Sequence, residues 1–374
     1  MKKNKLIIVA SSIIGLLVLL LIVLWLLSIF NHKYYTYEEV EAKMVSATEK
    51  FYKNNPDILP VNDGKTILPY NTLVENKFIE PLNEILKDGD TCSAEVNVIK
   101  NDNNYSYIPK LTCSDKYSTI ELAQHILNNN EVVSEGSGLY SDGKGGYYFR
   151  GKVNNNYITL GSFQGSNNKS DIPLLWQIIS ITSDNRIKIR ALHYAQKVSY
   201  DTRYNETKNI NVGYNDFEMS ILKEKLKEIE NDESFLTNDQ KSKLVKSKLC
   251  INKRSSSDTS RDGSTECAIL SEDEYLFGLM YPYEFIRASI DNNCKNMYDL
   301  SCQNFNILSG DGFGSFWTIT SNPSNDYEAY ACDGYTFFPS YANRERALYL
   351  TSYVNPYALF KSGEGTRDNP YVIK

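Results

Sequence analysis

The chain has 374 residues, of which 41% are apolar, 12% aromatic and 23% charged, and this apolar content excludes wholesale disorder because it can form a buried core. The formal net charge is −6, and the three lysines among the first thirty residues make the remainder more acidic still. This balance argues against a general nucleic-acid-binding protein, which needs a basic face. The length favours two domains rather than one.

An uncharged apolar stretch occupies residues 6–30 and follows Lys2, Lys3 and Lys5. At about 1.5 Å of rise per residue, a helix of this length would exceed the roughly 30 Å hydrocarbon core of a bilayer. A cleavable signal peptide is the alternative, but its apolar region usually has only about 7–15 residues. We therefore expect a transmembrane signal anchor, with residues 1–5 as a cytoplasmic tail. The expected location is the cell membrane, with the lipid bilayer as one partner and the C-terminal domains outside the cell.

The elements after the apolar stretch predict a small domain over residues 31–117. Thr36-Tyr-Glu-Glu39 is a capping box, and a helical apolar face follows it. A short second helix is expected near Asn71. Residues 92–113 alternate with period two around a central Asp-Asn turn, which predicts a β-hairpin that sets Cys92 opposite Cys113.

Seven cysteines all lie beyond the apolar stretch, where an extracellular compartment would favour disulfides. A bond between Cys92 and Cys113 follows from the hairpin register, with two buried free thiols as the alternative. In the distal part the expected pairs are Cys250 with Cys267, across a hydrophilic loop, and Cys294 with Cys302. Cys332 is then unpaired, although five distal cysteines permit other arrangements.

These proximal elements, with the sequences NTLVENKFIEPL and CSAEVNVIKNDNNYSYIPKLTC, together resemble the pilin-like ectodomain modules of Gram-positive surface proteins. The resemblance implies a pilin-like α+β domain next to the membrane. Residues 118–146 are rich in Gly, Ser, Asn and Asp, and predict a linker with a short helix.

The distal part, residues 147–374, predicts strands, then helices, then long loops and further strands. Hairpins are expected over residues 147–160 and 174–192, because turn residues separate two apolar runs in each. The late segments 316–320 and 347–351 are expected to return to the early sheet. This order indicates one α+β domain.

Five distal motifs, GLYSDGKGGYYFRGKVNNNYITL, LLWQIISITSDNRIKIRAL, SEDEYLFGLM, FWTITSNP and GEGTRDNPYVI, together resemble a recurrent extracellular domain of Gram-positive gut bacteria. That domain is similar to the lectin-like fold of C-type lectins and formylglycine-generating enzymes. The resemblance implies a surface domain with a variable loop region rather than a reaction. The expected fold class is therefore α+β, with an N-terminal transmembrane helix, a small α+β pilin-like domain and a larger α+β lectin-like domain.

The sequence assembles no catalytic or metal-binding motif, so we expect no catalytic residue, metal or cofactor. His193 has no second histidine beside it, which favours a structural role. Ser220-Ile-Leu-Lys223 fits the S-x-x-K pattern, but the companion motifs are absent. Residues 309–314, SGDGFG, could form a cation or phosphate loop, although a flexible turn is favoured because the carboxylate spacing of a calcium loop is missing.

A local basic run interrupts the acidic distal domain. A solvated helix face is the favoured interpretation, and contact with an anionic wall polymer or glycan is the alternative. The run consists of Lys241, Lys243, Lys246, Lys248, Lys253 and Arg254.

Tyrosine is abundant, with 28 residues, and several aromatic residues fall in loop-like distal sequence. Tyrosine offers rigid contact area with a polar tip, which suits recognition of proteins and sugars; packing of long loops is the alternative. The expected function is therefore an extracellular binding or adhesion protein that recognises a glycan or protein, with no nucleic-acid partner. A pilus-like or secretion-apparatus accessory subunit, and an extracellular enzyme, are the alternatives. The candidate binding residues are Tyr281, Tyr283, Trp317, Tyr327, Tyr330, Tyr335, Phe338 and Tyr341.

Overall fold

A computed structural model describes residues 34–61, 64–101, 104–163, 172–310 and 312–374. These residues form two compact units, which meet in the sequence between Thr119 and Ile120. The expected transmembrane helix, residues 6–30, lies outside the described residues. Among the residues that are described, no helix is both long and apolar enough to cross a membrane. The fold class expected from the sequence is corrected accordingly: the described chain mixes seven α-helices with twenty strands and contains no long apolar helix.

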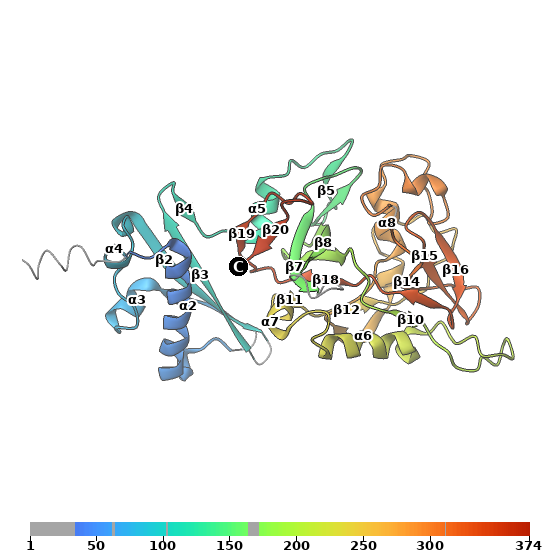
Figure 1. The fold of residues 1–374 in the computed structure, drawn as a ribbon, viewed down its shortest axis with the longest axis horizontal. Helices are drawn as coiled ribbons and strands as arrows, with labels where there is room; N and C mark the ends of the chain where they lie inside the picture. The colour runs from blue at the N-terminus through green and yellow to red at the C-terminus, as the bar shows by residue number, and fades with distance from the viewer. Residues whose placement is uncertain (1–33, 62–63, 102–103, 164–171, 311) are drawn as a thin grey trace, which may run out of the picture. The chain divides into compact units, whose positions relative to one another are not determined.

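The first unit is a four-stranded antiparallel sheet with one long helix, α2, packed on it (Figure 1). The strand order is β1-β2-β3-β4, so sequence neighbours are also neighbours in space. Its elements are α2 (Tyr37–Asn54), η1 (Pro56–Ile58), β1 (Lys65–Pro69), α3 (Tyr70–Glu75), α4 (Leu82–Ile85), η2 (Gly89–Thr91), β2 (Cys92–Asn101), β3 (Asn104–Cys113) and β4 (Tyr117–Ser118).

Helix α2 begins at the expected capping box. The Thr36 hydroxyl accepts a hydrogen bond from the Glu39 amide, and the Glu39 carboxylate accepts one from the Thr36 amide. One face of the helix is buried against the sheet, and it includes Val40 and Met44, both fully buried. The buried Glu41 carboxylate accepts hydrogen bonds from the hydroxyls of Tyr117 and Thr119, which attach the short strand β4 region to the helix.

The β2–β3 hairpin has the expected register. Cys92 pairs with Cys113 and Val96 with Pro109. Pro109 has no amide hydrogen, and it lies where β3 has no second partner, because β4 pairs only with the end of that strand. The structure joins Cys92 to Cys113 by a disulfide.

The second unit contains three sheets, and Figure 1 shows its helices lying along their edges and faces. The largest has nine strands, a second has five and a third has two. Its elements are α5 (Leu122–Asn128), β5 (Gly138–Ser141), β6 (Tyr147–Arg150), β7 (Tyr157–Phe163), β8 (Ile172–Ile181), β9 (Ile187–Ala191), β10 (Lys197–Ser199), η3 (Phe217–Met219), α6 (Ile221–Asn231), α7 (Asn238–Lys241), β11 (Leu244–Val245), β12 (Ser247–Cys250), η4 (Glu266–Ala268), β13 (Leu270–Tyr275), α8 (Pro282–Ala288), η5 (Leu300–Gln303), β14 (Phe316–Ser321), β15 (Glu328–Cys332), β16 (Phe337–Tyr341), β17 (Glu345–Ala347), β18 (Thr351–Val354), β19 (Phe360–Ser362) and β20 (Tyr371–Ile373).

The nine-stranded sheet follows the order β11-β18-β9-β8-β7-β20-β19, and β6 joins it through β8. The β8–β9 hairpin was expected. The hairpin expected over residues 147–160 is wrong, because β6 and β7 pair with successive parts of the long strand β8 instead of with each other. Strand β18 pairs with β9, but only Thr351 of the expected segment 347–351 lies in it, and Ala347 ends β17 in the five-stranded sheet. Strand β14 belongs to that sheet as well, whose order is β10-β17-β14-β15-β16.

The linker expected at residues 118–146 is not a separate segment. Leu122, Ala123 and Ile126 of α5 are buried in the core of the second unit, and β5 pairs with β6. Polar residues and glycines surround these apolar positions in the sequence, so the segment has the composition of a linker. The second unit also holds the disulfides Cys250–Cys267 and Cys294–Cys302, while Cys332 is a buried free thiol. These are the pairs named from the sequence.

Replacing both Cys92 and Cys113 by alanine is expected to destabilise the first unit by about 3 kcal/mol, because a loop of sequence separation 21 would no longer be closed in the unfolded chain. Thermal unfolding followed by circular dichroism would show an earlier transition for this unit. The transition of the second unit is the internal control. An unchanged first transition would contradict a stabilising role for the bond.

Candidate functional site: an arginine-lined pocket

Three of the eight aromatic residues expected to bind a ligand are part of the core. Tyr281 is 4% exposed, Trp317 0% and Tyr330 1%, so none of the three offers a surface for recognition. The others are partly buried or, for Tyr341, 36% exposed. Both faces of β14 and β15 are covered, which explains why aromatic residues there are enclosed. The partly buried or exposed members are Tyr283, Tyr327, Tyr335, Phe338 and Tyr341.

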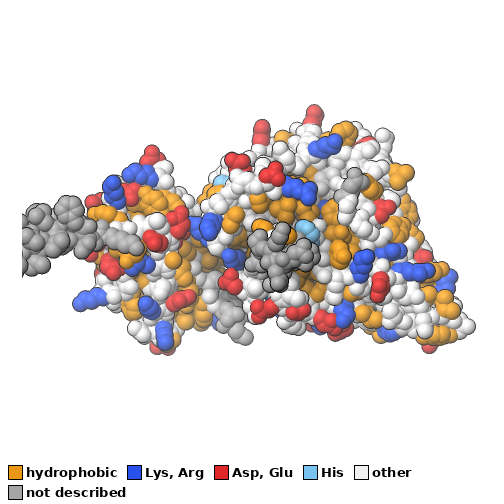
Figure 2. Space-filling model, in the orientation of Figure 1, with side chains coloured by type: hydrophobic (Ala, Val, Ile, Leu, Met, Phe, Trp, Pro, Cys, Tyr) orange, Lys and Arg blue, Asp and Glu red, His pale blue; other side chains and the backbone are white. Residues whose placement is uncertain are grey.

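The basic run is not one solvated helix face. Lys241 is buried and donates to the main-chain carbonyls of Glu230 and Asp232, at 2.8 and 2.6 Å. Arg254 is fully buried. On the face seen in Figure 2, basic and acidic side chains of the second unit are interspersed. Lys241 and Arg254 therefore provide structural contacts, while Lys246 and Lys248 of the run are exposed.

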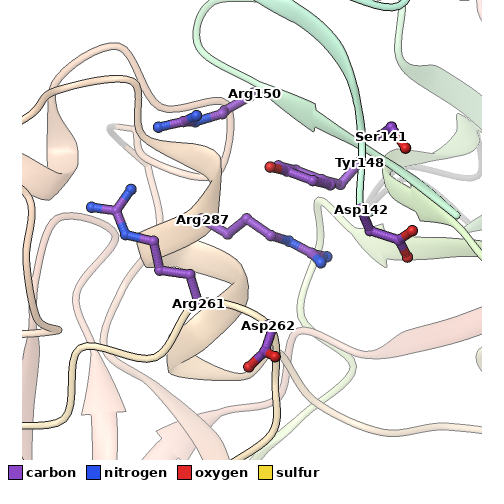
Figure 3. Close-up of a pocket in the computed structure, with 7 residues that line it drawn as sticks. All are labelled: Ser141, Asp142, Tyr148, Arg150, Arg261, Asp262 and Arg287. Atoms are coloured by element: carbon purple, nitrogen blue, oxygen red, sulfur yellow. The ribbon is translucent and has the colours of Figure 1, made fainter. Parts of the chain in front are cut away.

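A pocket of about 230 Å³ in the second unit brings together side chains that the sequence separates widely (Figure 3). Three arginines, from β6, from the loop closed by Cys250–Cys267 and from α8, line it with two aspartates. The pocket thus carries one more positive than negative charge. Its lining residues are Ser141, Asp142, Tyr148, Arg150, Arg261, Asp262 and Arg287.

The guanidinium ends of Arg150 and Arg261 lie on the same side of the pocket in Figure 3. Arg150 donates from Nε to the Ser289 carbonyl at 2.9 Å, and Arg261 donates to the Cys294 carbonyl. In the described part of the chain neither arginine makes an ion pair, so most of their N–H groups stay available. Burial lowers the pKa of Arg261 most, and the positive charge of Arg150 lowers it further. Two neighbouring like charges favour an anion between them.

Arg287 is oriented by aromatic rings. Its guanidinium carbon lies 4.2 Å from the ring centroid of Tyr148 and 5.4 Å from that of Tyr283. In Figure 3 it extends below the Tyr148 ring toward Asp142. Such cation–π contacts orient a guanidinium without consuming its hydrogen-bond donors.

The two aspartates present fixed hydrogen-bond acceptors in the same pocket. Asp142 accepts hydrogen bonds from the main-chain amides of Lys144 and Gly146, at 2.7 and 2.9 Å. Asp262 accepts one from the Ser264 amide at 3.0 Å, and hydrogen bonding to Ser264 lowers the pKa of Asp262, which is therefore ionised at neutral pH. Asp142 keeps its Oδ2 for a ligand hydroxyl, whereas Oδ2 of Asp262 lies 3.8 Å from Lys144 Nζ in an exposed ion pair.

A buried ion pair places the loop and α8 beside each other. Arg254 Nη1 donates to both Glu266 carboxylate oxygens, at 2.9 and 3.0 Å, and both side chains are 0% exposed. The same carboxylate accepts the amide of Tyr283 in the first turn of α8. Gly263 lies against the Tyr283 ring, where a Cβ would come within 2.9 Å. Arg261 and Asp262 in the loop are thereby fixed relative to Arg287.

Sequence reasoning did not identify this pocket, because no motif unites its residues. Arg150 and Arg261 are single arginines in unrelated segments, and Arg287 follows a buried helix start. The one available signal was the Cys250–Cys267 bond, which closes the loop that carries Arg261 and Asp262.

Substituting Glu266→Gln is expected to destabilise the second unit by about 1.5–3 kcal/mol, since it removes the buried carboxylate that Arg254 Nη1 binds and leaves Arg254 with Asp258, at 3.7 Å. Thermal unfolding would measure the loss. The matched control is Asp273→Asn, which breaks the exposed Lys227–Asp273 pair and should cost under about 1 kcal/mol. Equal effects of the two substitutions would contradict the role given to the buried pair.

Comparison with protein-family models, curated proteins and solved structures finds no match for this chain. The pilin-like and lectin-like resemblances stay predictions. The functional argument therefore depends on the chemistry of the pocket itself: clustered guanidinium groups facing carboxylate acceptors.

Proposed function

We propose that this chain is an extracellular binding protein whose second unit recognises an acidic glycan through the arginine-lined pocket. The observation that carries the proposal is the pair Arg150 and Arg261, two neighbouring guanidinium groups on the same side of the pocket. A planar guanidinium matches a carboxylate or phosphate with two parallel hydrogen bonds. An acidic group would therefore neutralise the repulsion between these side chains.

The remaining lining favours a sugar over a bare anion. Asp142 and Asp262 are hydrogen-bond acceptors, and a sugar hydroxyl can donate to each of them. A simple anion would be repelled by the same carboxylates. A sugar acid supplies both kinds of group on one ring, which fits a pocket that arginines and aspartates line together (Figure 3).

The size of the pocket indicates a terminal group of a longer molecule. Its volume of about 230 Å³ is below the ~300–1,000 Å³ that usually encloses a drug-sized ligand. The three disulfides are consistent with an extracellular protein, and the compartment outside a cell is where surface polysaccharides occur. We therefore propose the acidic residues of such a polysaccharide as the ligand.

Binding of the full chain to hyaluronan and polygalacturonate, two polymers that carry uronate carboxylates, tests the proposal. The wild type should bind at least one of them and should lose that binding when the carboxyl groups are reduced to alcohols. Arg150→Gln should weaken binding about tenfold or more, since a hydrogen bond to a charged group contributes roughly 1.5–3 kcal/mol. Surface plasmon resonance gives the dissociation constants.

The matched control for Arg150→Gln is Arg344→Gln, because Arg344 is an exposed arginine of the same unit outside the pocket. This variant should bind like the wild type. Absence of binding to both polymers, or equal binding of the native and carboxyl-reduced forms, would overturn the proposal.

A further inference from the structure

A second pocket of about 230 Å³ in the same unit contains a buried cation. Arg190 of β9 is 1% exposed, and its neighbour on β8, Gln177, is 4% exposed. Arg190 donates from Nη2 to the Gln177 amide oxygen at 2.8 Å and from Nη1 to the Leu308 carbonyl at 3.1 Å. Its Nε has no hydrogen-bond partner among the described residues.

The charge of Arg190 is not matched by a carboxylate. Within the described residues Arg190 makes no ion pair, and the nearby Glu284 is bonded to Lys188 at 2.5 Å. Burial lowers the pKa of Arg190 to about 10, so the guanidinium is still charged at neutral pH. Burial also raises the pKa of the Cys332 thiol to about 12, which leaves that neighbour neutral.

Two other buried cations of this unit each have a carboxylate partner among the described residues, and Arg190 has none. Lys188 and Arg254 are as buried as Arg190, and each faces a buried carboxylate, Glu284 or Glu266. An ion buried without a partner is costly, by several kcal/mol. None of the described carboxylates fills this role for Arg190, and an anionic ligand can reach it through the pocket that it lines.

The rest of the lining is suited to an anionic group. Arg367 adds an exposed second cation, and Ser309 and Tyr157 add hydroxyl groups. The Phe313 ring centroid lies 4.6 Å from the Arg190 guanidinium carbon and covers one of its faces. The guanidinium is thus held in position, with its Nε hydrogen unused.

We propose that this pocket is a second ligand site, which binds a small molecule through an oxyanion, a carboxylate or a phosphate, held by Arg190 and Arg367. The site is separate from the arginine-lined pocket and does not depend on the function proposed for it. The two pockets share no lining residue.

Thermal unfolding of the full chain in sodium D-glucuronate, sodium phosphate or sodium chloride at matched ionic strength tests this site. The midpoint of the second unit should rise saturably with glucuronate or phosphate and not with chloride, because a ligand that binds only the folded state stabilises it. A response to glucuronate alone identifies a carboxylate ligand, and a response to phosphate alone identifies a phosphate.

Two variants connect the response to Arg190. Gln177→Glu places a carboxylate where the amide oxygen now accepts from Arg190, so it should raise the ligand-free midpoint and abolish the response. Arg190→Met should abolish the response without lowering the ligand-free midpoint, since it removes an unpaired buried charge. Arg150→Gln, in the other pocket, should keep the response.

If neither glucuronate nor phosphate raises the unfolding midpoint saturably, the proposal of a second site is wrong. A rise of the midpoint that persists in both Arg190→Met and Gln177→Glu would overturn it as well. So would a rise that is lost only in Arg150→Gln. A rise that only Arg150→Gln removes would assign the anion to the arginine-lined pocket and support the polysaccharide proposal, so failure of one proposal is distinguishable from failure of the other.

Discussion

The buried ion pair between Lys188 and Glu284 is the contact on which the arrangement of the second unit depends. Lys188 Nζ lies 2.5 Å from a Glu284 oxygen, with the two side chains 3% and 0% exposed. Burial alone would lower the pKa of Lys188, but the Glu284 carboxylate outweighs it and raises that pKa. The other Glu284 oxygen accepts the Tyr281 amide at 2.9 Å, at the start of α8. One carboxylate thus caps the helix and attaches it to the central sheet.

Helix α8 in turn connects the two pockets. A second buried carboxylate, Glu266, binds its Tyr283 amide and fixes the disulfide-closed loop beside it. Arg287 on the helix faces the arginine-lined pocket, and the strand beneath presents Arg190 to the other pocket. Because paired charges fix the helix on both sides, the unpaired guanidinium groups are held in place without a ligand. Such preorganisation lowers the cost of ordering on binding.

Local sequence signals predicted the local structure. The Thr36 capping box, the β2–β3 register and the β8–β9 hairpin depend on residues close in sequence, so turn chemistry and alternation were sufficient. The error over residues 147–160 has a non-local cause: β8 is long enough for β6 and β7 to pair along the same edge, one after the other. The turn residues between β6 and β7 carry no information about β8, the strand with which both pair.

The candidate sites could not be predicted for a related reason. The polar residues of β9 alternate with apolar ones, a pattern typical of a strand with one solvated face. Here Glu284 of α8 covers Lys188, and Met280, Leu308 and Phe313 cover Arg190, so the two side chains become 2% and 1% exposed. Composition pointed instead to aromatic residues, yet Tyr281, Trp317 and Tyr330 among them are buried in the core.

The acidic balance of the chain bears on how its cationic pockets can act. With a net charge of −6, the protein as a whole does not attract anions from a distance, and fields between exposed charges fade within about 8–10 Å at physiological salt. Guanidinium groups in pockets act at contact range, where water is partly excluded and hydrogen-bond geometry decides the outcome. Each pocket therefore selects a single acidic group that is small enough to enter it. This selection connects the buried charge network to the ligands proposed for this protein.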